Sequence, residues 1–360
     1  MSNYSTATPP PALTKSKAKR LNPIWQARLD RFRSNRLGLI SLIIFSLVFI
    51  LCMAANVIAN DKPLLVSYDG DYYVPVLTAY PETTFGGVFE TEANYKDPAV
   101  QALIEDKGFY VMPIIPFADQ TPNVELGLPY PAAPNAQNWL GTDDQGRDML
   151  SGIFYGLRIS LSVALSSVVI ALTIGTILGL CAAYYGGRTD TLIMRLVDLQ
   201  LSFPTILMAL ILLAILGKGV FNVMLALVIV QWALYARTAR GVALTERRKE
   251  YVESAQCLVL STPRVILAHI LPNCLPSLIV IATLEVAGAI SLEATLSFLG
   301  LGLPVTQPSL GLLIANGFDY LLSGHPWISI LPGIALLITV FAINLVGDRL
   351  RDILNPRLRR

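Results

Sequence analysis

The segment LGLISLIIFSLVFILCMAANVIA, from Leu37 to Ala59, contains no charged residue. A helix needs about 20 apolar residues to cross a hydrocarbon core of roughly 30 Å, because each residue advances about 1.5 Å. This segment is long enough to do so. Five further apolar runs follow it, at Ile159–Tyr185, about Leu199–Leu216, Val220–Ala236, about Asn273–Phe298 and Pro326–Gly347. The sequence therefore predicts an all-α polytopic membrane protein with six transmembrane helices.

The composition excludes the other common classes of protein. Hydrophobic residues make up 54% of the 360 residues and charged residues only 14%, and the mean hydropathy is +0.57. A soluble chain carries about 25% charged residues, and collagen-like chains are far richer in glycine. Three of the four cysteines lie in predicted membrane helices and the fourth, Cys257, lies in a predicted inner loop. Neither a disulfide framework nor a metal site is expected from them.

Basic residues are distributed unequally between the two sides of the predicted helices. The segment before the first helix and those after the second, fourth and sixth hold 21 basic and 8 acidic residues, whereas the opposite side holds 6 and 15. Because basic loops stay in the cytoplasm, both termini are predicted to be cytoplasmic, with basic tails at 1–36 and 349–360. The inner excess suits anionic lipid, and the acidic outer side favours cationic or neutral cargo or a basic docking face on a partner.

The outer segment 60–138 is long enough for a small α+β insert between the first two membrane helices. Two β-rich runs flank Asp69-Gly70-Asp71, which is a hairpin signal. Asp97-Pro98 begins a predicted helix of about two turns that ends at Gly108. The following GFYVMPIIPF predicts an edge strand. The many aromatic residues of the insert fit a packed core, and they also fit a docking face for a partner or ligand.

The inner loop 237–272 predicts two short helices. In ERRKEYVESAQCLVL, apolar residues recur at helical spacing on one face, at Tyr251, Val252, Ala255, Leu258 and Val259. Ser261-Thr262-Pro263 then supplies a cap and a proline for the start of a second helix. Little apolar surface is expected within the loop for these helices to pack against. They therefore either rest on lipid or form a helical knob that docks into a soluble partner.

Catalytic motifs are absent from the sequence, but two carboxylates stand inside the predicted fifth helix. No G-x-x-x-x-G-K-[ST] or H-E-x-x-H occurs, so neither ATP binding by this chain nor metalloprotease chemistry is expected. Glu285 and Glu293 are about 80° apart on the helix and are candidate pathway residues or structural hydrogen-bonding groups. The segment LGLGLPVTQPSLG that follows fits a pathway-facing loop or an ordinary outer turn.

The inner loop also carries a family motif. EYVESAQCLVLSTPRVILAHILPN, from Glu250 to Asn273, resembles the EAA loop of ABC-transporter permease subunits, which docks into the cleft of an ATPase subunit. The family pattern of Glu-Ala-Ala, a later Gly and then Leu-Pro is matched by Glu253, Ser254, Ala255, Val259, Leu271 and Pro272. Valine stands where glycine would take a positive φ at little cost. Either the turn is built differently here or docking is altered.

Several other segments resemble the dipeptide, oligopeptide and nickel permeases. They run from Asn138 to Leu161, Arg195 to Leu210, Ala294 to Pro304 and Leu345 to Arg359. Ala59 to Leu77 is similar to the extra outer segment of the oligopeptide and microcin C branch. The resemblance implies a core like that of type I ABC importer permeases over 139–348, with a membrane helix at 37–59 before the insert.

The resemblance implies a permease subunit of an ATP-driven importer of peptides or peptide-like solutes in the bacterial cytoplasmic (inner) membrane, and not an enzyme. The implied partners are a second homologous permease subunit, two ABC ATPase subunits that hold ATP and Mg²⁺, an outer substrate-binding protein and membrane lipid, with no nucleic acid. The expected ATPase-docking residues are Tyr251, Glu253, Ser254, Ala255, Cys257, Leu258, Val259, Pro263, Leu271 and Pro272.

The proposed docking residues suggest two test substitutions, and two alternative functions stay open. Glu253→Arg and Ala255→Trp are each expected to leave folding intact but to uncouple transport. The alternative to a permease subunit is a stand-alone secondary transporter or channel that uses Glu285 and Glu293, and a further alternative is a membrane receptor. Co-purification of an ATPase and a second permease favours the permease subunit. Transport that needs a proton gradient and not ATP favours the secondary transporter.

Overall fold

The computed structural model describes Phe32 and residues 35–354, so most of both predicted basic tails lies outside the described residues. Within that part of the chain, five helices are long and apolar enough to cross a membrane. They are α2 (Arg36–Met53), α5 (Met149–Tyr185), α8 (Val220–Arg247), the continuous helix Thr262–Phe298 and α13 (Trp327–Leu354). The predicted all-α membrane fold with a small sheet is confirmed.

The third predicted membrane run is a bent pair of helices. α6 (Gly187–Ser202) and α7 (Thr205–Leu216) meet at an angle of 94°, and the number of candidate spans in the described residues is six if this pair is one broken span and five if it is a re-entrant loop. The prediction of a single helix from about Leu199 to Leu216 was therefore wrong. Phe203 is extended and Pro204 has no N–H to donate, so the helix stops there. Ion pairs from α8 to Asp190 and Asp198 hold α6 in place.

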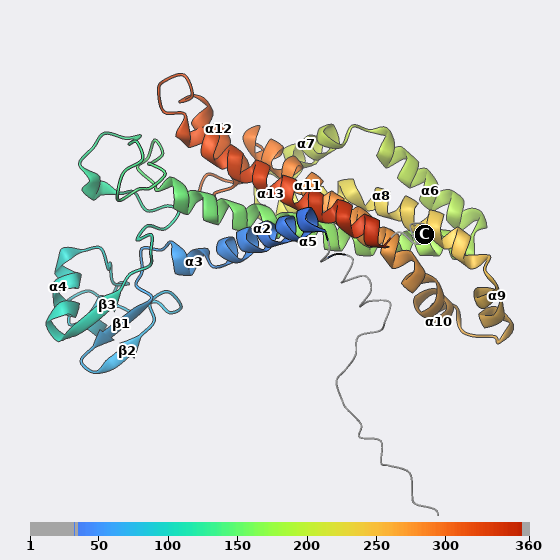
Figure 1. The fold of residues 1–360 in the computed structure, drawn as a ribbon, viewed down its shortest axis with the longest axis horizontal. Coiled ribbons are helices and arrows are strands. Elements are labelled where there is room, and N and C mark those ends of the chain that lie inside the picture. Colours follow the sequence, from blue (N-terminus) through green and yellow to red (C-terminus); the bar gives the residue numbers. More distant parts are fainter. Residues whose placement is uncertain (1–31, 33–34, 355–360) are drawn as a thin grey trace, which may run out of the picture.

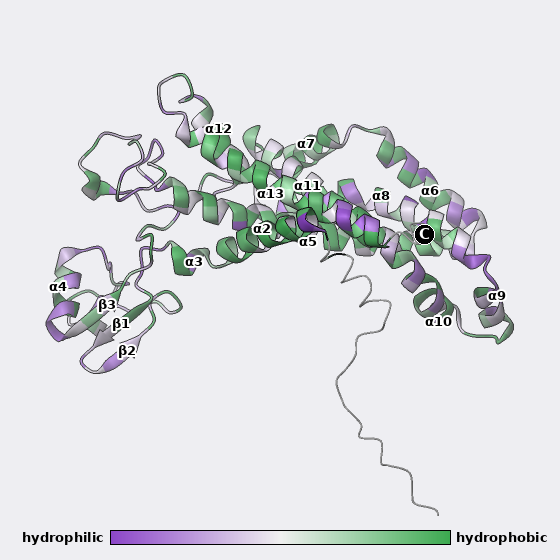
Figure 2. Ribbon diagram, viewed as in Figure 1, coloured by the Kyte–Doolittle hydropathy of each residue, from purple (hydrophilic) through white to green (hydrophobic). Residues whose placement is uncertain are grey.

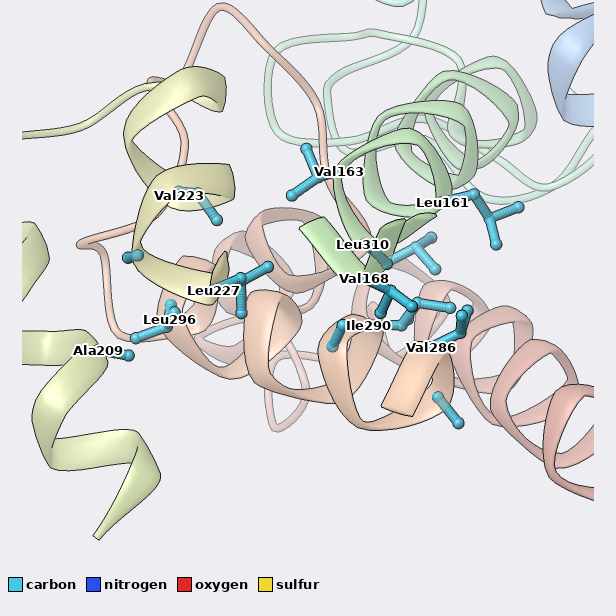
Figure 3. Close-up of a cluster of buried hydrophobic side chains, with 14 of the residues drawn as sticks. Leu161, Val163, Val168, Ala209, Val223, Leu227, Val286, Ile290, Leu296 and Leu310 are labelled. Atoms are coloured by element: carbon cyan, nitrogen blue, oxygen red, sulfur yellow. The ribbon is translucent and has the colours of Figure 1, made fainter. Parts of the chain in front are cut away.

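The membrane core is built around α5 and α8. A Cβ atom at Gly175 would lie 2.4 Å from the carbonyl oxygen of Trp232, and one at Gly179 would lie 2.4 Å from that of Ala236, so the two glycines let the helices touch along their backbones. Figure 3 shows apolar side chains of α5, α7, α8, α11 (Leu271–Phe298) and α12 (Leu310–Phe318) meeting in the largest buried cluster. α2 and α13 complete the cluster, to which they contribute Cys52 and Ile343.

The helix α12 was not predicted. It follows the irregular stretch 299–309, in which Gly300 has a positive φ, and the side chain of Ser309 accepts a hydrogen bond from the N–H of Leu312 to start the helix. Gly311 packs against the backbone of Ala294, where a Cβ would lie 2.1 Å from its carbonyl oxygen. The segment read as a loop or outer turn therefore ends in a helix that is packed into the core.

The outer insert folds as the sequence predicts. The strands β1 (Leu65–Tyr68), β2 (Asp71–Tyr73) and β3 (Gly108–Val111) form an antiparallel sheet in the order β2-β1-β3, so β3 is an edge strand. Asp97 caps α4 (Pro98–Lys107) through the N–H of Ala99, although the helix is ten residues long and exceeds two turns. The buried ring of Phe85 packs edge-on against four tyrosines, Tyr68, Tyr73, Tyr80 and Tyr95, which make the core of the insert.

The short elements and the two ends complete the architecture. α3 (Ala55–Ile58), η1 (Glu82–Phe85) and η2 (Val124–Leu126) lie on the side of the insert, and α9 (Glu250–Cys257), α10 (Thr262–Arg264) and the π-helix η3 (Val265–Ile270) lie at the opposite end. Figure 1 shows the insert and α9 at opposite ends of an elongated molecule. Polar residues gather toward these ends, with the apolar helices between them (Figure 2).

Candidate coupling site and membrane pathway

The inner loop forms the predicted pair of helices. α9 ends at Cys257, a turn follows, and α10 begins at Thr262 with Pro263 in its first turn. The side chain of Ser261 makes no capping hydrogen bond. From α10 the helix continues through η3 into α11 without a break. The turn is therefore followed directly by a helix long enough to cross the membrane.

α9 packs against a small hydrophobic core of its own chain. Val252 and Ala255 are buried among side chains of α5, α8, η3 and α11, including Val265, Ile270 and Cys274. The expectation that this loop has little apolar surface to bury against was therefore wrong, because the inner ends of three long helices supply that surface. Because Ala255 is buried, an indole at this position is now expected to disturb the packing, so Ala255→Trp is no longer expected to leave folding intact.

The turn after α9 presents an exposed apolar tip, formed by Leu258 and Val259, whose side chains are 74% and 89% exposed. The N–H of Val259 donates to Gln256 O at 2.9 Å and that of Leu260 to Ala255 O at 3.4 Å, which is the Schellman motif. Val259 takes φ 52°, the left-handed conformation that glycine adopts easily. The turn is thus built in the usual way despite the valine, which costs about 1–2 kcal/mol.

Hydrogen bonds at Tyr251 join α9 to two membrane helices. The Tyr251 hydroxyl donates to the carboxylate of Glu246 in α8 at 2.6 Å and accepts from the amide of Asn273 in α11 at 3.0 Å. Lys249 also pairs with Glu246 at 2.7 Å. Desolvation and the bond to Glu246 both raise the pKa of Tyr251, so the phenol keeps the proton that it donates. These bonds fix the orientation of α9 relative to α8 and α11.

The other expected docking residues lie on α9, on α10 and at the start of α11. Glu253, Ser254, Cys257, Pro263 and Pro272 are exposed, and Leu271 is half-buried. The structure therefore brings the expected residues together at one end of the molecule. Ala255 differs from the rest because it supports the surface from below.

Glu293 is a hydrogen-bonding centre inside the protein. It has no exposed surface, and it accepts hydrogen bonds from Ser160 of α5 at 2.6 Å and Ser297 of α11 at 2.8 Å. A carboxylate buried in this way is tolerated because donors surround it. With no accessible surface, Glu293 shares no open cavity with Glu285.

Glu285 lies in a different environment, eight residues earlier on α11. Its side chain is half-buried, and it forms no ion pair with any residue in the described part of the chain. Elsewhere in the core, Tyr235 of α8 is fully buried and its hydroxyl has no hydrogen-bond partner. Of the two glutamates of α11, Glu293 is therefore hydrogen-bonded within the core. Glu285 has no counter-ion in the described part of the chain.

The outer end of α5 is held by a buried polar network that sequence reasoning missed. Asp148 caps α5 through the N–H of Ser151 at 2.8 Å and accepts from the amide of Asn138 at 2.8 Å, and Asn138 in turn accepts from Asn123 at 2.8 Å. Burial raises the pKa of Asp148. The indole N–H of Trp327 donates to Thr142 O, which ties the start of α13 to the same loop. The polar run NWLGTDDQGRD was the available signal.

A bundle of membrane helices with a packed helix–turn–helix exposed at one end defines an integral membrane subunit built to contact a partner. Residues 171–360 match the family described as binding-protein-dependent transport system inner membrane component, and residues 24–77 match the N-terminal TM domain of oligopeptide transport permease C. The chain belongs to the binding-protein-dependent transport system inner membrane components, which are the permease subunits of ABC importers.

Three relatives illustrate the similarity. The chain is 35% identical to the inner membrane ABC transporter permease protein YejE of Escherichia coli, over 94% of this chain and 98% of that one. It is 33% identical to the peptidoglycan transport system permease protein YejE of Agrobacterium fabrum, over 96% of each chain. It is 44% identical to the di/tripeptide transport system permease protein DppC of Pseudomonas aeruginosa, over 61% of this chain and 72% of that one. The first two alignments are long enough to include the outer insert.

Proposed function

We propose that this chain is one permease half of an importer that moves peptides or peptide-like solutes into the cytoplasm. The di/tripeptide permease relative and the match to the N-terminal domain of oligopeptide transport permease C support the cargo class. The observation that carries the coupling role is the exposed tip of Leu258 and Val259 at the end of the molecule opposite the insert. An apolar tip of this kind is suited to a hydrophobic cleft on a partner.

The complete importer contains a second homologous permease subunit, two ATPase subunits and an outer substrate-binding protein. ATP and Mg²⁺ bind to the ATPase subunits, and this chain holds those subunits through its inner loop. The complex lies in the cytoplasmic membrane with both termini of this chain inside. The 21 basic residues on the inner side, against 6 on the outer side, support this orientation.

Coupling follows from how the tip is attached. The small core around Val252 and the hydrogen bonds of Tyr251 fix α9 to the inner ends of α8 and α11. When the ATPases close on ATP, the tip moves with the cleft that holds it, and α8 and α11 move with the tip. Two rigid arrangements of the helices, outward-facing and inward-facing, are then selected by the state of the ATPases.

The test is uptake by the complete complex in liposomes. Labelled peptides of graded length, the binding protein and Mg-ATP are supplied, with and without an imposed proton gradient. Uptake that requires ATP and ignores the gradient is expected. Uptake driven by the gradient alone would instead support a secondary transporter, and that result would contradict the proposal.

Glu253→Arg tests the coupling surface. Glu253 is exposed on α9, so the variant is expected to fold and to assemble with the second permease. Reversal of a charge beside the tip is expected to lower ATP-dependent uptake about tenfold, as for like charges at a docking surface. Normal uptake together with normal ATPase co-purification would rule out this face as the docking site.

A further inference from the structure

One face of the sheet β2-β1-β3 in the outer insert carries exposed aromatic side chains. Successive residues of a strand point to opposite faces of a sheet. Val66, Tyr68 and Tyr73 pack into the aromatic core of the insert, together with residues of α4. Tyr72 of β2 and Phe109 of β3 belong to the opposite face, and their side chains are 70% and 51% exposed. The sheet is therefore covered on one face and open on the other.

The apolar residues of the open face stand side by side across the strands. Ser67 of β1 pairs with Tyr72 on one side and with Phe109 on the other, so the three residues form one row. Leu65 and Val111 pair in the next row of the same face. Neighbouring strands lie about 4.8 Å apart, so Tyr72, Phe109, Leu65 and Val111 form one apolar surface, the sheet patch. Single exposed apolar side chains are common, whereas a contiguous apolar patch marks an interaction site.

The sheet patch has an acidic rim at its hairpin end. Asp69 and Asp71 flank the turn between β1 and β2, and Glu105 and Asp106 stand at the end of α4, just before β3. All four are exposed, and none forms an ion pair with a residue in the part of the chain that the structure describes. Lys107 is the basic residue next to them. Over the whole insert, 60–138, acidic residues outnumber basic ones by 11 to 3.

This charge selects among the occupants that the sheet patch could have. A second copy of the insert would place acidic groups against acidic groups, and anionic lipid headgroups would be repelled in the same way. A protein surface with an apolar centre and surrounding Lys and Arg side chains complements both the patch and its rim. The insert lies at the end of the molecule opposite the coupling tip, which is the side of the outer substrate-binding protein (Figure 1).

We propose that the sheet patch is a docking surface for the substrate-binding protein of this importer, and that Lys and Arg side chains of that protein surround it. The inference rests on the proposed function, and it assigns the outer insert to recognition of this partner. Tyr72 and Phe109 are the anchors, because aromatic side chains contribute most to the energy of protein interfaces. Asp69, Asp71 and their acidic neighbours attract the partner, since charges at the rim of an interface act mainly on the rate of association.

The experiment measures how tightly the purified substrate-binding protein of the same importer binds to the complete permease–ATPase complex in nanodiscs. The double variant Tyr72→Thr/Phe109→Thr removes both anchors. Both side chains are exposed and threonine suits a strand, so the insert is expected to keep its fold. The Kd is expected to rise at least about tenfold, as for the loss of aromatic anchors at an interface. Circular dichroism and thermal unfolding check that the variant is folded.

Phe89→Thr is the matched control, because it makes the same exchange at an aromatic side chain that is 63% exposed. The carbonyl of Phe89 accepts a hydrogen bond from the N–H of Thr83 in η1, and Phe85 of η1 packs on the covered side of the sheet. Phe89→Thr is therefore expected to leave the Kd unchanged. Asp71→Asn, at the rim, is expected to slow association and to weaken its dependence on salt, with dissociation unchanged.

An unchanged Kd in the double variant would overturn the inference, and so would an equal rise in Phe89→Thr. An unchanged Kd together with loss of a permease subunit from the purified complex would assign the sheet patch to a contact between subunits. An unchanged Kd with a new dependence of stability on the nanodisc lipid would assign it to lipid. Failure of the proposed function is distinguishable, because a wild-type complex that binds the substrate-binding protein but imports no peptide with ATP would contradict the proposed cargo alone.

Discussion

The two ends of this permease are held together by different forces. At the inner end, α9 rests on a hydrophobic cluster and presents two exposed apolar side chains at its tip. At the outer end, the start of α5 is fixed by buried side-chain hydrogen bonds among Asn123, Asn138 and Asp148. The inner end therefore combines an apolar core and an apolar tip with the hydrogen bonds of Tyr251, whereas the outer end is held mainly by buried side-chain hydrogen bonds that specify one geometry.

This difference fits the proposed coupling. Apolar contacts are non-directional, so a tip that docks into an ATPase as proposed can shift without losing them. Hydrogen bonds weaken steeply when their angle changes, so the outer network fixes the end of the insert relative to the start of α5. The inner end is predicted to be sensitive to changes at its surface, and the outer end to changes in its interior.

The largest effect is expected from Leu258→Asp at the tip. The side chain is exposed in this chain, so stability is expected to stay unchanged. On docking, the apolar contact of a leucine is lost, about 1.5–3 kcal/mol, and a charge must be desolvated in addition. ATPase co-purification and ATP-dependent uptake are expected to fall at least tenfold. Both are measured on the complex purified through this chain.

Leu77→Asp is the control for that experiment, since Leu77 is equally exposed but lies in the outer insert. The substitution is expected to leave ATPase co-purification unchanged. Equal loss of the ATPase in both variants would show that a leucine-to-aspartate change anywhere on the surface disturbs assembly, and the tip would then have no special role.

Asn138→Ala is expected to produce the largest loss of stability at the outer end. It removes one of the two hydrogen bonds of the buried Asn123 amide and one of the bonds that the buried Asp148 carboxylate accepts, which costs about 3 kcal/mol for the two together. Thermal unfolding of the purified protein measures this cost. Gln137→Ala removes an exposed member of the same network and is expected to cost much less. Similar losses in the two variants would mean that burial does not matter there.

Periodicity and turn chemistry predicted most of the elements because those signals are local. The hairpin at Asp69-Gly70, the cap at Asp97 and the two helices of the inner loop all depend on residues within a few positions of one another. The structure departs from the predictions where the decisive contact is distant in sequence. Ala255 is buried by residues of α5, α8 and α11, and α12 owes its place to contacts with α5 and α11.

The membrane carboxylates illustrate the same limit. Their spacing on one helix placed Glu285 and Glu293 within reach of a common cavity, and only the packing separates their environments. Ser160, 133 positions away in sequence, satisfies Glu293. Glu285 has no comparable partner in the described part of the chain, and no pattern within α11 distinguishes the two residues.

Val259→Gly tests the strain in the tip. Glycine adopts φ 52° freely, so the variant loses the backbone strain of about 1–2 kcal/mol that valine has in the folded state. Glycine also makes the unfolded chain more flexible, and this offsets about half of the gain. A gain of about 1 kcal/mol in the free energy of unfolding is expected. Leu258 has an ordinary φ of −77°, so Leu258→Gly is expected to destabilise instead. Changes of equal sign in both variants would contradict the conformation described for Val259.

The smallest expected effect concerns how the stability contributed by Asp148, the N-cap residue of α5, depends on pH. Burial raises the pKa of Asp148 above its ordinary value, although the bonds from Asn138 and Ser151 oppose the shift. The folded state therefore holds the proton of the Asp148 carboxyl more tightly than the unfolded state does. The stability that Asp148 contributes is greatest below its unfolded pKa, and it is lost as the pH rises through its folded pKa.

The variant Asp148→Asn does not titrate at this position, and it loses one acceptor at the start of α5, worth about 1 kcal/mol. Thermal unfolding between pH 4 and about pH 8 is expected to show the variant least stable relative to wild type at the acid end, with the gap narrowing as the pH rises. A gap that widens with pH would mean that the hydrogen bonds outweigh burial and that the carboxylate is favoured in the folded protein.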